Sequence, residues 1–362
     1  MKPCPRFPVQ IFRIIISTQL FMMSAHPVSS QKPVSVRIQK DDARHVVTVT
    51  ADGKPFTSFI YPDSLEKPVL YPVFAADGQV VTRGFPLEPR PGEPTDHPHH
   101  IGIWFNYENV NGLDFWNNSY AIPAEKKNKY GWIKVKGVKI IPGENFSELE
   151  FNADWVNQSG DILLKEKTLF RFYGFENERF IVRSTTLTAE QDVAFNDAKD
   201  GLMAIRVTHE LELPSAQPKE FKDDKGNITK VEANAGGAAN GNYITSEGKT
   251  GDSAWSTRAA WCMMYGKKGK DTLSILILDD PGNPGYPTYW HARGYGLFSA
   301  NPLGQKIFSN GKETMNFKLM KNESARFKYT IVIGSGKKRI SDSRIRELIP
   351  GTGKAGRTKK DN

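Results

Sequence analysis

The stretch Glu148-Leu149-Glu150-Phe151-Asn152-Ala153-Asp154-Trp155 alternates polar and apolar residues without interruption. Successive side chains of a β-strand point to opposite faces, so this period of two predicts a strand with one buried face. The same alternation occurs at residues 34–39 and 326–333. Residues 273–278 are apolar apart from Ser274, which predicts a strand buried on both faces. The chain is therefore expected to be mostly β.

Turn-forming pairs separate these runs, at Asp52-Gly53, Asp77-Gly78, Pro142-Gly143 and Asn310-Gly311. Long helical patterns are nearly absent, and the best one is a short C-terminal helix over 341–348, capped by Ser341 or Asp342. Roughly fifteen or more short strands exceed one immunoglobulin-sized sandwich. We predict an all-β fold: a single large antiparallel β-sandwich over residues 31–340, with a short helix and basic tail over 341–362.

Residues 1–30 have the layout of a secretory signal peptide. An apolar run from Ile14 to Ala25 follows three basic residues, and small residues precede Gln31. The run is too short to span a bilayer, and no later stretch is long and apolar enough to do so. The sequence therefore predicts an exported protein, periplasmic or secreted, without a membrane span.

Charge and cysteine content exclude two further classes. The formal charge of +9 is concentrated in the N-terminal segment and the C-terminal tail, while basic residues of the body alternate with acids, which does not indicate a nucleic-acid partner. Cys4 lies in the signal segment, so Cys262 has no partner for an internal disulfide. Between Trp261 and Met263, Cys262 is expected to be a buried structural thiol.

The segment Asp96-His97-Pro98-His99-His100 follows a proline-rich loop and carries three histidines within four positions. If it is extended, His97 and His99 point to one side and His100 to the other. Such a His-x-His pair has the spacing of metal ligands, and imidazole is also the usual acid–base group near neutral pH. Asp96 could orient one ring. The alternative is a set of structural histidines bonded to the backbone.

Residues 200–210 form a second candidate segment. In a strand, Arg206 and Glu210 share a face, where they could border a cleft or form a surface ion pair of little energetic value.

The third segment, residues 279–296, mixes turn formers with Trp290, His291 and Arg293. Aromatic faces stack on sugar rings, and polar side chains bind their hydroxyls, so this mixture indicates a small-molecule pocket. A rigid aromatic loop is the structural alternative. Because this loop and the His97–His100 loop are the richest in titratable and aromatic groups, we expect them to meet in one cleft. The sequence has no phosphate-binding glycine-rich loop before a helix, no nucleophile elbow, no cysteine pairs for zinc and no His-Glu-x-x-His motif.

Four motifs resemble a known bacterial domain family of unknown function that is often labelled "methane oxygenase PmoA". They are Tyr71-Pro72-Val73, the Asp96–His100 segment, Asn111-Gly112-Leu113-Asp114-Phe115-Trp116 and residues 291–304. The true PmoA subunit is a membrane protein with several spanning helices, so its activity is not adopted here. The family is also similar to the galactose-mutarotase-like supersandwich, which includes sugar epimerases, lyases and binding domains. That resemblance implies a histidine–carboxylate site built from His99 or His100, His291, and Glu210 or Asp280.

We therefore predict a carbohydrate-active enzyme that applies histidine–carboxylate acid–base chemistry to a sugar or glycoside. The alternatives are a non-catalytic carbohydrate-binding protein and a metal-dependent oxygenase. No cofactor is certain, a divalent metal is an open alternative, and the expected partner is a small-molecule or oligosaccharide substrate. The expected catalytic residues are His99, His100, His291 and Glu210. The expected substrate-binding residues are Arg83, Trp104, Trp116, Arg206, Trp290 and Arg293, and His97 with His99 would bind any metal.

Overall fold

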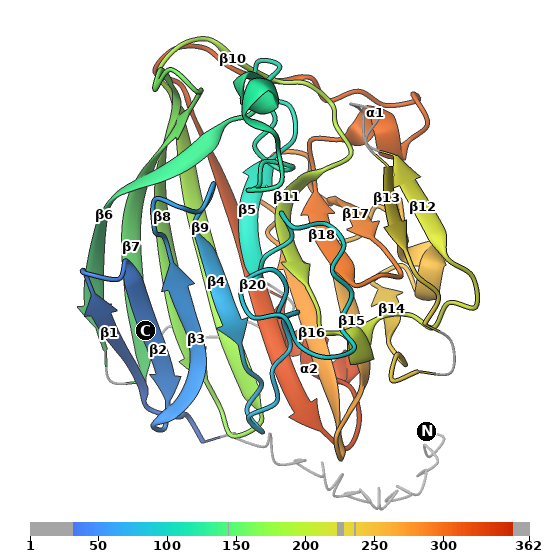
Figure 1. The fold of residues 1–362 in the computed structure, drawn as a ribbon. Coiled ribbons are helices and arrows are strands. Elements are labelled where there is room, and N and C mark those ends of the chain that lie inside the picture. The colour runs from blue at the N-terminus through green and yellow to red at the C-terminus, as the bar shows by residue number, and fades with distance from the viewer. Residues whose placement is uncertain (1–31, 144, 223–227, 235–236, 350–362) are drawn as a thin grey trace, which may run out of the picture. The chain divides into compact units, whose positions relative to one another are not determined.

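Two antiparallel sheets of eight strands each form the framework (Figure 1). The computed structural model describes residues 32–143, 145–222, 228–234 and 237–349. In spatial order, the first sheet contains β1 (Val36–Asp41), β2 (Val46–Ala51), β3 (Lys54–Ile60), β4 (Val69–Val73), β5 (Ile103–Tyr107), β11 (Gly201–Arg206), β18 (Leu297–Asn301) and β17 (Tyr289–Ala292). The second contains β14 (Asn242–Thr245), β15 (Trp261–Lys268), β16 (Asp271–Asp279), β20 (Ser324–Gly336), β9 (Glu178–Ala189), β8 (Ile162–Gly174), β7 (Phe146–Val156) and β6 (Trp132–Pro142).

Short elements connect and flank these sheets. Two small strand pairs are β10 (Val193–Phe195) with β19 (Phe317–Leu319), and β12 (Lys219–Lys222) with β13 (Ile228–Val231). The helices are η1 (Ala124–Lys129), η2 (His209–Leu211), η3 (Gly251–Ala254), α1 (Gln305–Phe308) and α2 (Asp342–Leu348). None of the helices in the described ranges is long and apolar enough to cross a membrane.

The period-two stretches become strands as predicted. In β7, Phe151 and Trp155 are fully buried while Asn152 between them is exposed. The side chains of β16 are buried on both faces from Leu273 onward. Strands make up 48% and helices 8% of the structure, which confirms the large antiparallel β-sandwich. Cys262 is a buried free thiol in β15, also as expected.

Hydrophobic side chains of the described residues gather in three layers. The largest cluster lies between the two sheets and includes Phe59, Phe151 and Ile277. A second cluster, with Trp104 and Leu297, lies on the outer face of the first sheet. A third covers the outer face of the second sheet and includes Leu276, Phe180 and Ile345. The outer face of the first sheet is the one that carries the histidine loop.

The C-terminal helix α2 seals the third cluster. Ser341 is its N-cap, and the Ser341 hydroxyl accepts a hydrogen bond from the Arg344 amide at 3.2 Å. Ile345 of this helix is buried. The predicted helix and cap are thereby confirmed. The predicted signal peptide and the basic end of the tail lie outside the described residues.

A buried ion pair links β8 and β9 inside the sandwich. The Arg183 guanidinium contacts the Glu166 carboxylate, both side chains are almost fully buried, and the indole of Trp155 donates to Glu166 at 2.8 Å. The guanidinium also lies 4.5 Å from the ring centre of Phe105, on the opposite sheet. Burial lowers the pKa of Arg183 to about 10, although Glu166 opposes the shift, so the residue is still a cation at neutral pH.

Replacing Arg183 with Met is expected to destabilise the fold by about 3–5 kcal/mol, because the buried Glu166 carboxylate loses its counter-charge. The matched control is Arg171→Met on β8, whose own ion pair with Glu148 is half exposed. That control is expected to cost less than about 1 kcal/mol. Urea unfolding of both variants at pH 7 measures the difference, and equal losses would contradict the assignment of the Arg183 pair as a core element.

Candidate functional site

Residues His97–His100 form a tight turn rather than an extended strand. The His100 amide donates to the His97 carbonyl oxygen at 3.0 Å, and Pro98 occupies the second position of the turn. His97 adopts a φ of 46°. The turn stacks the ring of His97 on that of His100, with centroids 4.7 Å apart. The expectation that His97 and His99 share one side while His100 points away is wrong, because a turn replaces the strand geometry on which it rested.

The Asp96 carboxylate is the anchor of this turn. Arg206 at the end of β11 donates to both of its oxygens at 2.9 Å, and Arg83 donates to one of them at 3.0 Å. The other oxygen contacts His97 Nδ1. Burial acts to raise the pKa of Asp96, but Arg206, His97 and Arg83 together hold it well below its usual value. Asp96 is therefore an ionised carboxylate that orients His97.

Arg83 holds the loop itself. Its guanidinium donates to the carbonyl oxygens of Pro94, Asp96, His97 and His100 at 2.8–3.3 Å. Both Arg83 and Arg206 are fully buried, and neither lines the pocket described below. The structure thus corrects their expected role as substrate ligands, because their Nη groups bind the protein's own carboxylate and, for Arg83, backbone carbonyl oxygens.

Strand register sets the floor of the site. Trp104 on β5 is opposite Ala204 on β11, Ala204 is opposite Ser299 on β18, and Ser299 is opposite His291 on β17. Directly paired residues of neighbouring strands share a face. The row therefore places His291 on the same face of the sheet as Trp104.

The same register places Trp290 in the core. As the neighbour of His291 on β17, it points to the other face of the sheet, where it is fully buried and donates to the Ala259 carbonyl oxygen at 2.9 Å. Its expected role in substrate binding is therefore corrected. Trp104 is also fully buried, beneath His100, and does not line the pocket.

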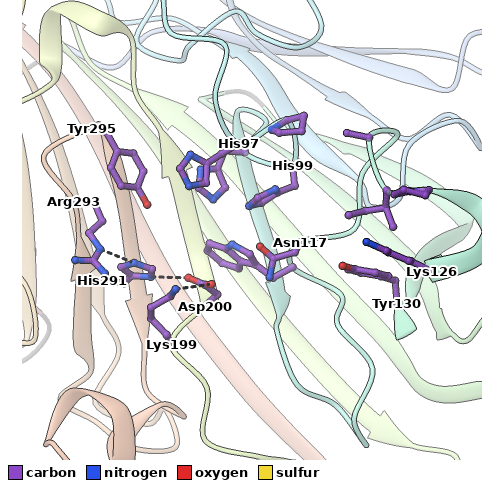
Figure 2. A pocket seen from close by; sticks show the side chains of 16 residues that line it. His97, His99, Asn117, Lys126, Tyr130, Lys199, Asp200, His291, Arg293 and Tyr295 are labelled. Atoms are coloured by element: carbon purple, nitrogen blue, oxygen red, sulfur yellow. Dashed lines mark hydrogen bonds and ion pairs between the residues drawn. The ribbon is translucent and has the colours of Figure 1, made fainter. Parts of the chain in front are cut away.

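A pocket of about 240 Å³ brings the two predicted loops together (Figure 2). Three of its walls come from the histidine turn, from the segment around Asn117 and η1, and from the ends of β11 and β17. Figure 2 shows His97, His99, Asp200, His291 and Arg293 around it. The lining consists of His97, Pro98, His99, His100, Trp116, Asn117, Ala121, Ile122, Pro123, Lys126, Tyr130, Lys199, Asp200, His291, Arg293 and Tyr295.

Asp200 is the carboxylate of this pocket. His291 Nδ1 lies 3.2 Å from an Asp200 oxygen, without the angle of a hydrogen bond, and Arg293 Nε donates to His291 Nε2 at 3.2 Å. Lys199 lies 3.5 Å from the other Asp200 oxygen. Asp200 is the first residue of the candidate segment 200–210, in which the sequence pattern had instead favoured Glu210 as the site carboxylate.

Glu210 and Asp280 do not line the pocket. Strand β11 ends at Arg206 and η2 follows, so the alternation that placed Glu210 on the face of Arg206 stops before it. The Glu210 carboxylate instead accepts hydrogen bonds from Thr208 and from Lys268, the latter at 3.1 Å. Asp280 pairs with Lys328 at 2.8 Å. The carboxylates expected from the resemblance are thus replaced at the pocket by Asp200.

Burial favours the neutral form of the pocket histidines. It is the main cause of the lowered pKa of His97, although Asp96 opposes the shift. Burial also holds the pKa values of His99, His100 and His291 well below the usual value of an imidazole. A neutral imidazole keeps one ring nitrogen as a hydrogen-bond acceptor and the other as a donor.

Hydrogen bonds fix the tautomers of three of these rings. Arginine can only donate, so the bond from Arg206 to His100 Nδ1 at 3.3 Å puts the ring proton of His100 on Nε2. By the same reasoning, the bond from Arg293 puts the proton of His291 on Nδ1, facing Asp200. Asp96 accepts from His97 Nδ1, so the lone pair of His97 is on Nε2. In the described structure no hydrogen bond reaches His99, whose ring lines the pocket.

The residues present do not form a ready metal site. Within the described ranges, no group of three or more His, Cys, Asp or Glu side chains is arranged to hold a metal ion. His97, one of the two candidate ligands, uses Nδ1 for Asp96.

Replacing Asp96 with Asn is expected to cost about 3–5 kcal/mol at pH 7, because two buried guanidinium groups lose their carboxylate. The depressed pKa adds a pH dependence. A carboxylate with a lowered folded-state pKa stabilises the fold above its unfolded value of about 3.9, and this stabilisation is lost as the pH falls below that value. The difference in the free energy of unfolding between parent and variant should thus persist from pH 7 to pH 5 and narrow below about pH 4.

Urea unfolding at pH 7, 5 and 3 measures this gap. The control is Asp154→Asn, which removes a half-exposed pair with Lys136 at 3.6 Å and is expected to change stability by less than about 1 kcal/mol. A gap for Asp96→Asn that is small, or that widens in acid, would contradict the assignment of Asp96 as an ionised anchor.

The solved structures that match this chain include proteins named as α-galactosidases, a galactose 1-epimerase and a galactose mutarotase-like protein. A GH36 α-galactosidase AgaB from Geobacillus stearothermophilus matches 83% of this chain at 11% identity with a TM-score of 0.38. The chain spans only 41% of that enzyme. The galactose 1-epimerase of Lactobacillus acidophilus (11% identity, TM-score 0.33) matches 85% of this chain and 100% of its own. A galactose mutarotase-like protein of Clostridium acetobutylicum (11% identity, TM-score 0.37) matches 84% of this chain and 99% of its own.

These similarities are too remote to transfer an activity or a ligand to this chain. A search among curated proteins found no significant match. One family model covers most of the sequence, from residue 46 to residue 349, and includes both the histidine turn and the His291 strand. The chain belongs to that family, DUF6807, a family of unknown function.

Proposed function

We propose that this chain is an exported carbohydrate-active enzyme that applies histidine–carboxylate acid–base chemistry to a sugar ring or a glycoside. One observation carries the proposal: two histidine–carboxylate pairs, Asp96 with His97 and Asp200 with His291, meet at one pocket. In the first pair the histidine lines the pocket and the carboxylate stands behind it. In the second pair both members line it.

His97 is suited to act as the general base. Asp96 fixes its tautomer and stabilises the imidazolium that forms when Nε2 takes a proton. The ring of His97 stacks on the ring of Tyr295, with centroids 4.9 Å apart, and on that of His100, with centroids 4.7 Å apart. These contacts hold the His97 ring in place. The Asp200 carboxylate is suited to be the second proton carrier. His291 and Lys199 position it, so His291 serves as a positioning residue.

The remaining lining suits one sugar ring. The aromatic side chains of Trp116, Tyr130 and Tyr295 can contact the apolar face of a ring, and Asn117 and His99 can bond its hydroxyl groups. A volume of about 240 Å³ is small for a binding pocket. It accommodates one ring, while the rest of a longer glycoside would extend into solvent.

Two alternatives share the same pocket. A binding protein would use the aromatic and polar lining without proton transfer. A metal-dependent oxygenase, as the PmoA label suggests, would need a set of ligands that the described residues do not present. The dyads at His97 and Asp200 favour the enzyme over both, because mere binding does not require a carboxylate-oriented neutral imidazole.

We expect His97→Gln and Asp200→Asn each to lower turnover by about 100- to 10,000-fold, the usual cost of removing a general acid or base. The parent and both variants are assayed on a panel of reducing sugars and glycosides, and melting temperature is measured on the same samples. Proton exchange into substrate in D₂O and release of reducing sugar report the reaction. His99→Gln, His100→Gln and His291→Gln complete the series.

The control variant is His45→Gln, which changes an exposed histidine in the turn between β1 and β2. It is expected to retain full turnover. Sugar binding by a parent protein that turns over no substrate would instead support the binding alternative. Full turnover in both His97→Gln and Asp200→Asn would contradict the acid–base mechanism.

Export is the second part of the proposal. Cell fractionation is expected to recover the protein outside the cytoplasm, with a mature N-terminus near Gln31. A full-length cytoplasmic product in a host that secretes other signal-bearing proteins would contradict it.

A further inference from the structure

A second cleft shares the short helix η1 with the histidine pocket. The cleft has a volume of about 560 Å³ and lies between η1, the start of β6, the end of β7 and the turn that follows β7. Pro123 and Lys126 line the histidine pocket. Ala124 and Lys127, the residues next to them in sequence, line the cleft. The ridge between the pocket and the cleft is therefore one short helix wide.

The outer face of the second sheet becomes apolar beside this cleft. Strands β6, β7 and β8 lie side by side at the edge of that sheet (Figure 1), and Glu150 of β7 forms an ion pair with Lys167 of β8 in the middle of the face. At the end next to η1, Val156 of β7 is opposite Trp132 on one side and Ile162 on the other. Directly paired residues share a face, so these three half-buried side chains form one apolar strip, which lines the cleft.

Polar side chains border the apolar strip. Asp154 of β7 is opposite Lys134 of β6 and lies 3.6 Å from Lys136. Gln158 presents an exposed amide in the turn between β7 and β8. A sugar ring has an apolar face that packs on an indole, while its hydroxyl groups bond to amides, carboxylates and ammonium groups. Because Lys136 and Asp154 pair with each other, the border suits a neutral sugar.

Lys127 connects the cleft to the wall of the histidine pocket. Its ammonium lies 5.6 Å from the ring centre of Trp132 and donates to Asn118 Oδ1 and to the Ser119 carbonyl oxygen, each at 2.7 Å. Asn118 and Ser119 directly follow Asn117, which lines the histidine pocket. These contacts hold Trp132 at a fixed position relative to that wall. A ligand that reaches both sites thus binds to one preorganised surface.

The histidine pocket accommodates one ring, so the rest of a longer glycoside has to cross the surface around the pocket. We infer that the cleft beyond η1 is a second sugar subsite, at which a neutral unit of the same oligosaccharide stacks on Trp132. This inference rests on the proposed function and names its substrate class, an oligosaccharide that spans η1. Once one unit is bound in the pocket, the second contact is intramolecular and raises the overall affinity.

Binding of sugars of increasing length tests the inference. Calorimetry on the full chain compares glucose with cellobiose and cellotriose, glucose with maltose and maltotriose, and galactose with galactobiose and galactotriose. In at least one series, an oligosaccharide is expected to bind about 10- to 100-fold more tightly than its monosaccharide, because a further ring stacks on an indole. The monosaccharide reports on the histidine pocket alone.

Variants assign the gain in affinity to the cleft. Trp132→Ala should remove the gain, while Trp132→Phe, which keeps an aromatic ring, should retain part of it. Melting temperature and monosaccharide binding, measured on the same samples, show that each variant is folded. The matched control is Phe146→Ala at the opposite end of β7, whose exposed ring also lies near a cation, 4.8 Å from the Arg171 guanidinium. This control is expected to keep the full gain.

The outcomes separate this inference from the proposed function. A gain that survives in Trp132→Ala, or equal affinities for all lengths of a sugar that is turned over, would overturn the inference and leave the enzyme proposal standing. A parent dimer that Trp132→Ala dissociates, measured by sedimentation, would assign the strip to a second copy and also overturn the inference. A gain lost in Trp132→Ala without turnover of any sugar would support the subsite and favour the binding alternative. Absence of binding and turnover for every sugar would overturn both.

Discussion

The bidentate ion pair between Arg206 and Asp96 is the interaction on which the arrangement of the site depends. It ties the end of a central strand to a loop more than a hundred positions earlier in the chain. Arg83, Arg206 and Asp96 are all buried. The fold tolerates these charges because each has an opposite charge and hydrogen bonds beside it. A buried pair of this kind adds little net stability. It does select one loop conformation, since any other would remove the Asp96 carboxylate from the two buried guanidinium groups.

The sheets and the loops contribute different parts of the pocket. The row from Trp104 through Ala204 and Ser299 to His291 is set by strand register, so its spacing is rigid. The histidine turn is set by polar contacts to Arg83 and Arg206. Together they bring His291 from the sheet and the imidazoles of the turn to one pocket. Titratable and aromatic side chains are thereby placed around the same small volume.

Much of the fold could be predicted from the sequence, because alternation, turn pairs and the Ser341 cap are local signals. The candidate loops could be found by their composition. The sequence could not show which side chains contact one another across the fold. Arg83 and Arg206 were expected to bind a ligand, but their true partner depends on which strands become neighbours. Local patterns also failed where an element ended early, as between Arg206 and Glu210, and where Pro98 replaced a strand by a turn.

The adjacency of Trp290 and His291 has an evolutionary consequence. One side chain belongs to the core and the next to the pocket, so inserting or deleting a single residue in β17 would exchange them and damage both. Variation among relatives should therefore spare the length of this strand. The segment that carries Asn117 and Lys126 is under no such restriction, because it lies outside both sheets. New specificities in this family would then arise by changing that segment while the histidine wall stays the same.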